Sequence, residues 1–168
     1  MKIDLKWLKM HPQENKKFHL EAIGEDELLK ELGGRFIAPV KVELLMSNNH
    51  RVLAGQGRVQ TLLELTCSRC LTELQFPVNS EFSMNLVDIA YRDEFMADED
   101  EIILADQDIL DIKPWVEAAI FINLPLNPLC NADCKGICSG CGVNRNLAEC
   151  RCKEEEIDPR WTKLKNLS

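Results

Sequence analysis

Eight cysteines, arranged as four close pairs, constrain the fold of this chain more than any other feature. They are Cys67, Cys70, Cys130, Cys134, Cys138, Cys141, Cys150 and Cys152. No apolar stretch follows the basic residues at the N-terminus, so no signal peptide is visible, and no apolar run approaches the roughly 20 residues of a membrane helix. We therefore expect a soluble, cytoplasmic protein that does not bind membranes. Cytosolic thiols stay reduced, and closely spaced reduced thiols typically bind a metal.

The spacing of the cysteines predicts two zinc sites. A tetrahedral site needs four ligands about 2.3 Å from the metal, usually delivered as two short pairs. Cys67-Ser-Arg-Cys70 is one such pair, and Cys138-Ser-Gly-Cys141 is another, with Gly142 allowing a tight exit. The economical partition has a local site of Cys138, Cys141, Cys150 and Cys152, and a second site that joins Cys67 and Cys70 to Cys130 and Cys134. Other partitions stay open, including one site with spare thiols.

An iron–sulfur cluster is the main competitor of zinc. Cys134-x3-Cys138-x2-Cys141 matches the spacing found in radical enzymes that use S-adenosylmethionine, but too little chain follows it to build their barrel. Catalytic zinc needs an open coordination position, whereas eight thiols fill two closed sites. His11, His19 and His50 lack the carboxylate spacing of a hydrolase, and no phosphate-binding glycine loop is present. We therefore expect two structural zinc ions, no catalysis and no small-molecule substrate.

The rest of the chain predicts a β-rich body. The 168 residues, 45% of them hydrophobic, suffice for an ordinary core. Three runs, 38–46, 51–67 and 73–89, are typical of an antiparallel meander whose turn between the last two runs carries Cys67 and Cys70. Residues 18–23 alternate like a strand, and 25–32 read as a short helix. Gly55 and Gly57 suggest a bulge or bend in the second long strand.

A longer helix is expected after the sheet. Asp111 can cap it, Pro114 is tolerated in its first turn, and Pro125 stops it. The predicted fold class is α+β: an antiparallel sheet or partly open barrel with one long helix over residues 1–129, and a cysteine-rich, zinc-bound segment over 130–168. Asp158-Pro159-Arg160 should begin a short helix inside that segment.

The charge is uneven along the chain. The total is −8, from 20 basic and 28 acidic residues, and residues 67–129 hold 3 basic against 13 acidic groups. An RNA phosphate backbone would be repelled there. The run 92–101 is expected to be a mobile loop that is either solvated or a docking surface for a basic partner. Weak or indirect RNA contact would then fall on basic residues near the C-terminus, namely Lys135, Arg145, Arg151, Lys153, Arg160, Lys163 and Lys165.

These motifs, taken in this order, resemble those of one protein family. The resemblance rests on Cys67-Ser-Arg-Cys70-Leu71, on Leu124-Pro125-Leu126, and on the run from Cys130 through Cys138-Ser-Gly-Cys141-Gly-Val-Asn144-Arg-Asn146 to Cys152, followed by Asp158-Pro159-Arg160. The chain is similar over about residues 40–168 to the YceD family, the large ribosomal RNA subunit accumulation proteins of bacteria and plastids. Ile137 and Ser139 stand where Leu and Pro are expected. The first 35 residues have no such likeness.

The resemblance implies a role in the synthesis, processing or stability of large-subunit ribosomal RNA. We therefore hypothesise a non-enzymatic ribosome-biogenesis factor that binds a basic ribosomal protein or a precursor particle. The alternative is a nucleic-acid-binding zinc ribbon acting in transcription, whose affinity would fall steeply with salt. A metal-dependent enzyme would require water as a zinc ligand.

Overall fold

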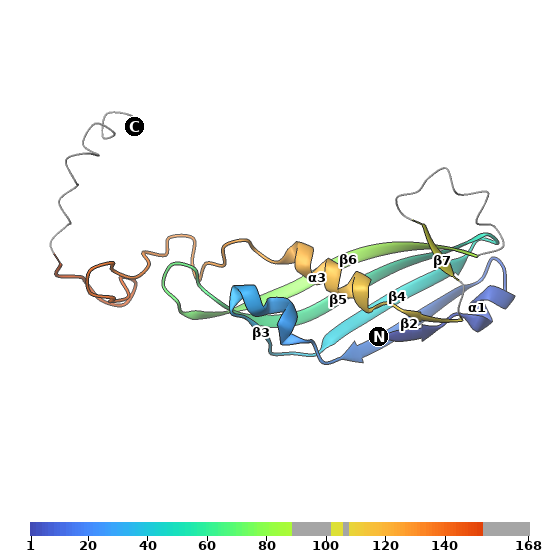
Figure 1. The fold of residues 1–168 in the computed structure, drawn as a ribbon, viewed down its shortest axis with the longest axis horizontal. Helices are drawn as coiled ribbons and strands as arrows, with labels where there is room; N and C mark the ends of the chain where they lie inside the picture. Colours follow the sequence, from blue (N-terminus) through green and yellow to red (C-terminus); the bar gives the residue numbers. More distant parts are fainter. Residues whose placement is uncertain (89–101, 106–107, 153–168) are drawn as a thin grey trace, which may run out of the picture.

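The computed structural model of the chain describes residues 1–88, 102–105 and 108–152. These residues form an elongated molecule, in which a long sheet carries helices on one face and the cysteine-rich segment extends beyond one end (Figure 1). The acidic loop predicted at 92–101 and the helix predicted from Asp158 lie outside the described residues.

The body is a six-stranded sheet. Its strand order is β2-β4-β5-β6-β7, and the short β3 pairs with β5. All neighbours are antiparallel except β6 and β7, which are parallel. The strands are β2 (Asn15–Ala22), β3 (Arg35–Phe36), β4 (Val40–Asn48), β5 (Val52–Thr66), β6 (Glu73–Asp88) and β7 (Ile102–Ala105).

The predicted meander is confirmed in β4, β5 and β6. Strands β5 and β6 form a long hairpin whose pairing runs from Val52↔Val87 to Thr66↔Glu73. At its far end the chain turns through residues 67–72, which carry Cys67 and Cys70. The hairpin therefore holds this cysteine pair at one end of the sheet, away from α1 (Figure 1).

Alternation of side chains gives the sheet one apolar face and one exposed face. In β4, Val40, Val42, Leu44 and Met46 are buried, whereas Lys41 and Glu43 between them are exposed. The same period of two holds along β5. Burial on one face of an antiparallel sheet fixes its register, because a shift by one residue would turn every apolar side chain outward. We call the exposed side, with Lys41 and Glu43, the bare face.

Short elements cover the apolar face. Leu5, Leu8, Leu29, Ile112 and Ile120 of this layer are fully buried in the common core. Strands β1 and β8 pair with each other as a separate two-stranded sheet. The layer consists of β1 (Lys2–Asp4), α1 (Lys6–Met10), the 3-10 helix η1 (Asp26–Leu32), β8 (Ile109–Asp111) and α3 (Lys113–Asn123).

Helix α3 leads the chain from the sheet to the second set of cysteines. Val116, Ala119 and Ile120 form its buried side, and it packs on β5 and β6. Its eleven residues match the average length of a helix in globular proteins, so the long helix expected from the sequence is an ordinary one. Ile112 occupies the N-cap position predicted for Asp111, although Asp111 Oδ1 still accepts the backbone N–H of Lys113 at 3.0 Å.

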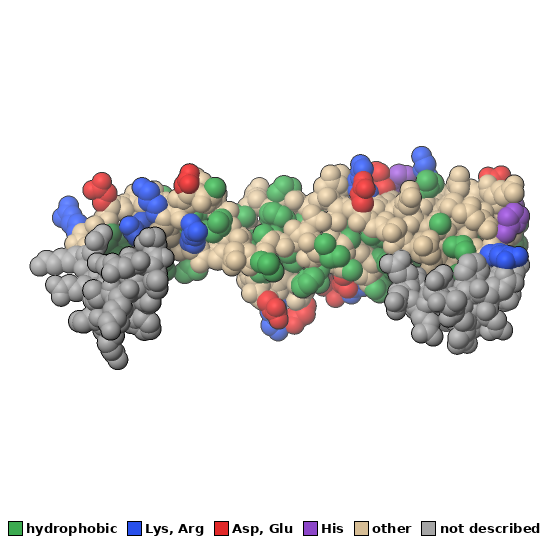
Figure 2. Space-filling view, turned by 90° about the horizontal axis from the view of Figure 1, so that it is seen from above, with side chains coloured by type: hydrophobic (Ala, Val, Ile, Leu, Met, Phe, Trp, Pro, Cys, Tyr) green, Lys and Arg blue, Asp and Glu red, His purple; other side chains and the backbone are tan. Residues whose placement is uncertain are grey.

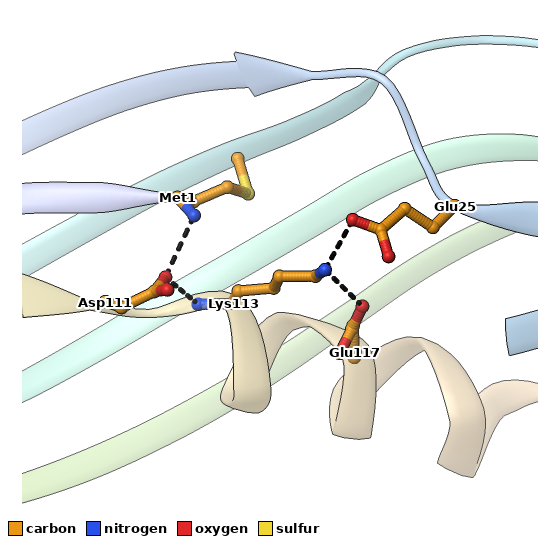
Figure 3. Close-up of polar contacts among 5 residues, drawn as sticks. All are labelled: Met1, Glu25, Asp111, Lys113 and Glu117. Atoms are coloured by element: carbon orange, nitrogen blue, oxygen red, sulfur yellow. Dashed lines mark hydrogen bonds and ion pairs between the residues drawn. The ribbon is translucent and has the colours of Figure 1, made fainter. Parts of the chain in front are cut away.

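Polar contacts fix the start of α3 to the rest of the covering layer (Figure 3). The α-amino group of Met1 donates to Asp111 at 2.9 Å, which lowers the pKa of that carboxyl group. The Lys113 ammonium bridges Glu25, just before η1, and Glu117 of its own helix. These exposed pairs orient the helix more than they stabilise it, because solvent screens them.

The barrel part of the predicted fold class is wrong. Strands β2 and β7 are the two edges of an open sheet and do not meet. Closing a sheet requires staggered, strongly coiled strands, usually with bulges. The β4–β5 and β5–β6 registers instead run without an inserted residue.

The bulge suggested by Gly55 and Gly57 is also absent, since both glycines lie within continuous pairing. Gly57 has a packing role instead. A Cβ atom there would lie 2.3 Å from the Phe82 ring, so the glycine leaves room for this half-buried aromatic side chain. Among the described residues, no helix is both long enough and apolar enough to cross a membrane.

Candidate metal centres

The first cluster joins the end of the β5–β6 hairpin to the segment after α3. It consists of Cys67, Cys70, Cys130 and Cys134, whose sulfur atoms all lie within 4.8 Å of one another. The Sγ atoms of Cys67 and Cys134 are 3.8 Å apart, and those of Cys70 and Cys130 are 3.4 Å apart. Three of the four residues are buried, and Cys130 is exposed. Residues that are 67 positions apart in sequence thus meet in one small core.

Backbone hydrogen bonds shape the turn that presents Cys67 and Cys70. The Cys67 N–H donates to the Thr72 carbonyl and the Leu71 N–H donates to the Cys67 carbonyl, both at 2.9 Å. The backbone and hydroxyl groups of Ser68 both donate to the Pro128 carbonyl, at 2.9 and 2.8 Å. The turn is therefore tied directly to the chain that delivers the other two thiols.

The second cluster lies in the cysteine-rich lobe, which we define as residues 130–152. It consists of Cys138, Cys141, Cys150 and Cys152, again with all sulfur atoms within 4.8 Å of one another. The Cys150 Sγ lies 3.2 Å from that of Cys138 and 3.6 Å from that of Cys141. Cys141 and Cys152 are exposed and the other two are half-buried, so this cluster is more open to solvent than the first.

The same turn occurs in both clusters. After Cys138, the Gly142 N–H donates to the Cys138 carbonyl at 2.9 Å, as the Leu71 N–H does to the Cys67 carbonyl. The residue after each second cysteine adopts a left-handed backbone conformation, with φ of 58° at Leu71 and 71° at Gly142. Such a turn exposes N–H groups to the sulfur atoms, and it suits glycine far better than leucine.

Gly136 and Gly142 offer a matched test of how the lobe is built. Their φ values are 72° and 71°, but a Cβ at Gly136 would lie 3.0 Å from the Arg69 carbonyl oxygen, whereas a Cβ at Gly142 would meet nothing within 4 Å. We expect Gly142→Ala to destabilise the metal-loaded lobe by about 1–2 kcal/mol, from backbone conformation alone. Gly136→Ala should cost more because it also pushes the lobe off the hairpin. Amide hydrogen exchange across 134–146 measures both, and equal costs would contradict the Arg69 contact.

Leu71 should respond in the opposite direction. Its side chain is 63% exposed and makes little packing contact, so its left-handed conformation brings strain without compensation. Leu71→Gly is expected to stabilise the first turn by up to about 1 kcal/mol. Hydrogen exchange at the Leu71 amide, whose N–H donates to Cys67, measures the change. Faster exchange in the glycine variant would show that the leucine side chain holds the turn.

The thiols in each cluster differ strongly in acidity. Burial raises the pKa of Cys67, but backbone N–H groups of Cys130, Cys70 and Arg69 outweigh this effect and lower it to about 6. Backbone N–H groups of Cys141 and Gly140, with the Cys150 thiol, lower the pKa of Cys138 to about 6. Neighbouring thiols raise the pKa values of Cys130 and Cys152 to about 12. Each cluster therefore contains one thiol that ionises easily and one that ionises only with difficulty, so a cation is needed to hold four thiolates together.

The geometry suits a tetrahedral metal ion. Four sulfur atoms about 2.3 Å from one zinc ion are about 3.8 Å from each other. The separations of 3.2–3.8 Å are close to this value and far above the roughly 2 Å of a disulfide. All eight cysteines are free thiols. Both clusters could hold a metal ion, and the structure brings together the same two groups of four that the sequence spacing favours.

Sequence reasoning missed the polar residues that surround the first cluster. Arg69 Nη1 donates to the Cys134 carbonyl at 3.0 Å, and the Thr72 hydroxyl lies 3.3 Å from the Cys70 sulfur. Asn146 Nδ2 donates to the Cys134 sulfur at 3.3 Å. The Asn144-Arg-Asn146 run between the last two cysteine pairs was visible in the sequence, but its spacing alone assigned it no contact.

The histidines lie elsewhere. His11 stacks on Trp7 with ring centroids 4.3 Å apart, and His50 contacts Gln13, both at the α1 end of the sheet. His19 lies on the bare face, beside an open hollow of about 640 Å³ lined by side chains of mixed charge such as Lys17, Glu43 and Arg58. Neither place is at the cysteine end of the molecule (Figure 1). The imidazoles therefore do not extend either sulfur cluster.

Comparison with known proteins gives a consistent family match. Residues 55–168 match the family described as large ribosomal RNA subunit accumulation protein YceD. An uncharacterized protein of Mycobacterium tuberculosis is 34% identical over 102 residues, which is 58% of this chain and 47% of that protein. The chloroplastic large ribosomal RNA subunit accumulation protein YCED homolog 1 of Arabidopsis thaliana is 25% identical over 155 residues, covering 77% of this chain and 48% of that one.

The relatives differ in length. The chain spans about half the length of the mycobacterial and plant relatives, but 96% of the uncharacterized protein YlbN of Bacillus subtilis, to which it is 25% identical over 168 residues. No solved structure matches. The matched region 55–168 includes all eight cysteines and both asparagines that contact the first cluster.

Proposed function

Since this chain belongs to the YceD family of large ribosomal RNA subunit accumulation proteins, we propose that it is a non-enzymatic ribosome-biogenesis factor. In this proposal it acts in the cytoplasm and supports the synthesis, processing or stability of large-subunit ribosomal RNA. It does so by binding a basic ribosomal protein or a precursor particle. The observation that carries the proposal is the pair of four-thiol clusters within a region that matches the family.

We propose that both clusters hold structural zinc. Four thiols are a complete tetrahedral set, as in structural zinc sites, whereas catalytic sites keep a position for water or substrate. When bound, the metal would crosslink segments that have little apolar core of their own. The first set (Cys67, Cys70, Cys130, Cys134) would tie the hairpin to the chain after α3, and the second set (Cys138, Cys141, Cys150, Cys152) would close the outer loop.

In this proposal, RNA and a protein partner contact different parts of the chain, and the distribution of charged residues supports this. The cysteine-rich lobe carries Lys135, Arg145 and Arg151 against Asp133 and Glu149, and Arg69 adds a further cation from the hairpin turn. Lys and Arg side chains are prominent on this lobe in the space-filling view (Figure 2). Weak RNA contact is therefore proposed for the lobe, and the acidic middle third of the sequence is assigned to a basic protein partner.

The same lysine and arginine side chains favour one alternative function, a nucleic-acid-binding zinc ribbon acting in transcription. The two functions differ in how binding depends on salt. A direct phosphate binder loses affinity steeply as salt rises, by about 10³–10⁵ between 50 and 200 mM when it makes six to ten phosphate contacts. A factor that docks on a protein should retain its partner after nuclease treatment. Affinity capture from cell extract at two salt concentrations, with and without nuclease, therefore separates them.

The acidic region gives a further prediction. Changing Asp98, Glu99, Asp100 and Glu101 to Asn and Gln is expected to slow association with a basic partner and to flatten its salt dependence, because complementary charge mainly accelerates encounter. Association rates at low and moderate salt measure the effect. An unchanged rate and slope would show that this region is only solvated.

A cellular experiment tests the function itself. Cells that lack their own copy receive the wild-type chain or Cys67→Ser/Cys134→Ser, with Asn79→Ala on the bare face of β6 as a control. The proposal expects the double cysteine variant to accumulate less large-subunit than small-subunit ribosomal RNA, and expects the control to restore the ratio. A normal ratio in cells without any copy would overturn the proposal.

A further inference from the structure

Two asparagines connect the second cluster to the sulfur atoms of the first. Asn146 Nδ2 donates at 3.3 Å to the Cys134 sulfur, and Asn146 Oδ1 accepts the backbone N–H of Lys135 at 2.8 Å. The Asn146 side chain is therefore hydrogen-bonded both to the sulfur of Cys134 and to the backbone of the next residue. Hydrogen bonds of this kind orient metal ligands and reduce the charge on a thiolate sulfur.

Asn144 makes a second, separate connection. Its Nδ2 donates to the Thr72 hydroxyl oxygen at 3.3 Å, and that oxygen lies 3.3 Å from the Cys70 sulfur. The Cys70 thiol donates to this oxygen, and once Cys70 is a thiolate the Thr72 hydroxyl can donate to the sulfur while still accepting from Asn144. Asn144 Oδ1 also accepts from the backbone and the side chain of Asn146, at 2.9 Å each, so the two asparagines hold each other in place.

Both asparagines lie in the loop that the second cluster closes. They fall between Cys141 and Cys150, whose sulfur atoms are 3.6 Å apart. The loop packs little apolar surface: Leu147 is 84% exposed and the neighbouring residues 145–149 are all exposed. Backbone hydrogen bonds, such as that from the Arg145 N–H to the Gly136 carbonyl at 2.9 Å, hold part of the loop, and the rest depends on the thiol cluster at its ends and on the asparagine contacts. Opening the cluster would therefore loosen the contacts of the asparagines with the first cluster.

We infer that Asn144 and Asn146 couple the two centres, so that closing the second cluster on its metal raises the metal affinity of the first. The inference rests on the proposed structural metal at both clusters and adds an energetic coupling between them. Loss of an outer hydrogen bond to a metal ligand typically lowers affinity 10- to 100-fold. Because coupling is reciprocal, filling the first cluster strengthens the second by the same factor.

The test follows individual thiols in the full-length reduced chain. Zinc alone is supplied from a metal buffer, and alkylation of each cysteine is read peptide by peptide as free zinc rises. Cys141→Ser opens the second cluster, Asn146→Ala removes one connection, and the double variant combines them. Asn79→Ala on the bare face is the matched asparagine control. The measured quantity is the free-zinc concentration that protects half of Cys67 and Cys134.

Coupling predicts that this concentration rises about tenfold in Asn146→Ala and at least as much in Cys141→Ser, which loosens both asparagines. The double variant should rise no further than Cys141→Ser, because opening the second cluster already breaks the Asn146 connection. The control should match the wild-type chain. Unchanged protection of Cys67 in Cys141→Ser, or effects that multiply in the double variant, would overturn the inference while leaving two independent zinc sites. A chain in which zinc protects no cysteine would instead overturn the proposed metal sites themselves.

Discussion

Removing the metal is expected to unfold the cysteine-rich lobe and leave the six-stranded sheet folded. Structural zinc contributes roughly 10–16 kcal/mol in small peptides, and residues 130–152 bury little else. The sheet has its own core, formed by Leu44, Leu63, Leu86 and the elements packed above them. Treatment with a chelator should therefore abolish amide protection in the lobe and preserve it in β4 and β5. Loss of both together would mean that the sheet depends on the metal.

Single cysteine variants should divide this effect between the clusters. Cys138→Ser is expected to lose one zinc equivalent and to release residues 138–152, with weaker binding at the first cluster. Cys67→Ser should lose the other equivalent and loosen the junction between the hairpin turn and Pro128. Elemental analysis and alkylation mapping measure both, with the exposed Ser139→Ala as a control inside the lobe. If both variants leave the same pair of cysteines unprotected, the division into two clusters is wrong.

Acid is expected to release the metal steeply. Zinc binds thiolates, so protons compete for every ligand that is not already ionised. Without metal, Cys67 and Cys138 have pKa values of about 6, whereas Cys130 and Cys152 have values of about 12. Between pH 6 and 8 each zinc therefore displaces at least the proton of Cys130 or Cys152, and its affinity should fall at least about tenfold for each unit that the pH falls.

Below pH 6, Cys67 and Cys138 also become protonated, so the slope should steepen further. The pKa of Cys67 is depressed, which means that its ionised form favours the folded turn at high pH and loses this contribution as the pH falls toward 6. Zinc release measured with a metal indicator between pH 8 and 5 gives the slope. An affinity that does not change between pH 8 and 6, or a slope that does not steepen below pH 6, would contradict ligation by these thiols.

The strands could be read from the sequence because their signal is local. Alternation along 38–46, 51–67 and 73–89 identifies β4, β5 and β6 within a few residues, and the turn that carries Cys67 follows from the break between the last two runs. The parallel pairing of β7 and the separate β1–β8 sheet could not be read in this way. Strands β1 and β8 are more than 100 residues apart, and β7 follows β6 after 13 residues; in neither case does a local period encode which strand lies beside which.

The tertiary structure also determines that the sheet stays open and has no bulge at its glycines. Gly55 and Gly57 are common signs of a bulge, but here they make room for side chains from neighbouring strands, Phe82 above all. A residue pattern shows that a glycine is required without showing whether backbone conformation or space requires it. The packing partner decides this, and it is more than twenty residues away in the sequence.

For the candidate site, the sequence by itself determined the ligand type, the number of thiols and the economical grouping, since metal chemistry demands pairs of soft ligands at short spacing. Only the tertiary structure decided what surrounds them. The hairpin and α3 place Cys67 and Cys134 3.8 Å apart, bury three members of the first cluster and leave the second open. The contact from Asn146 to the Cys134 sulfur arises from this meeting, because a side-chain hydrogen bond depends on distance in space and leaves no period in the chain.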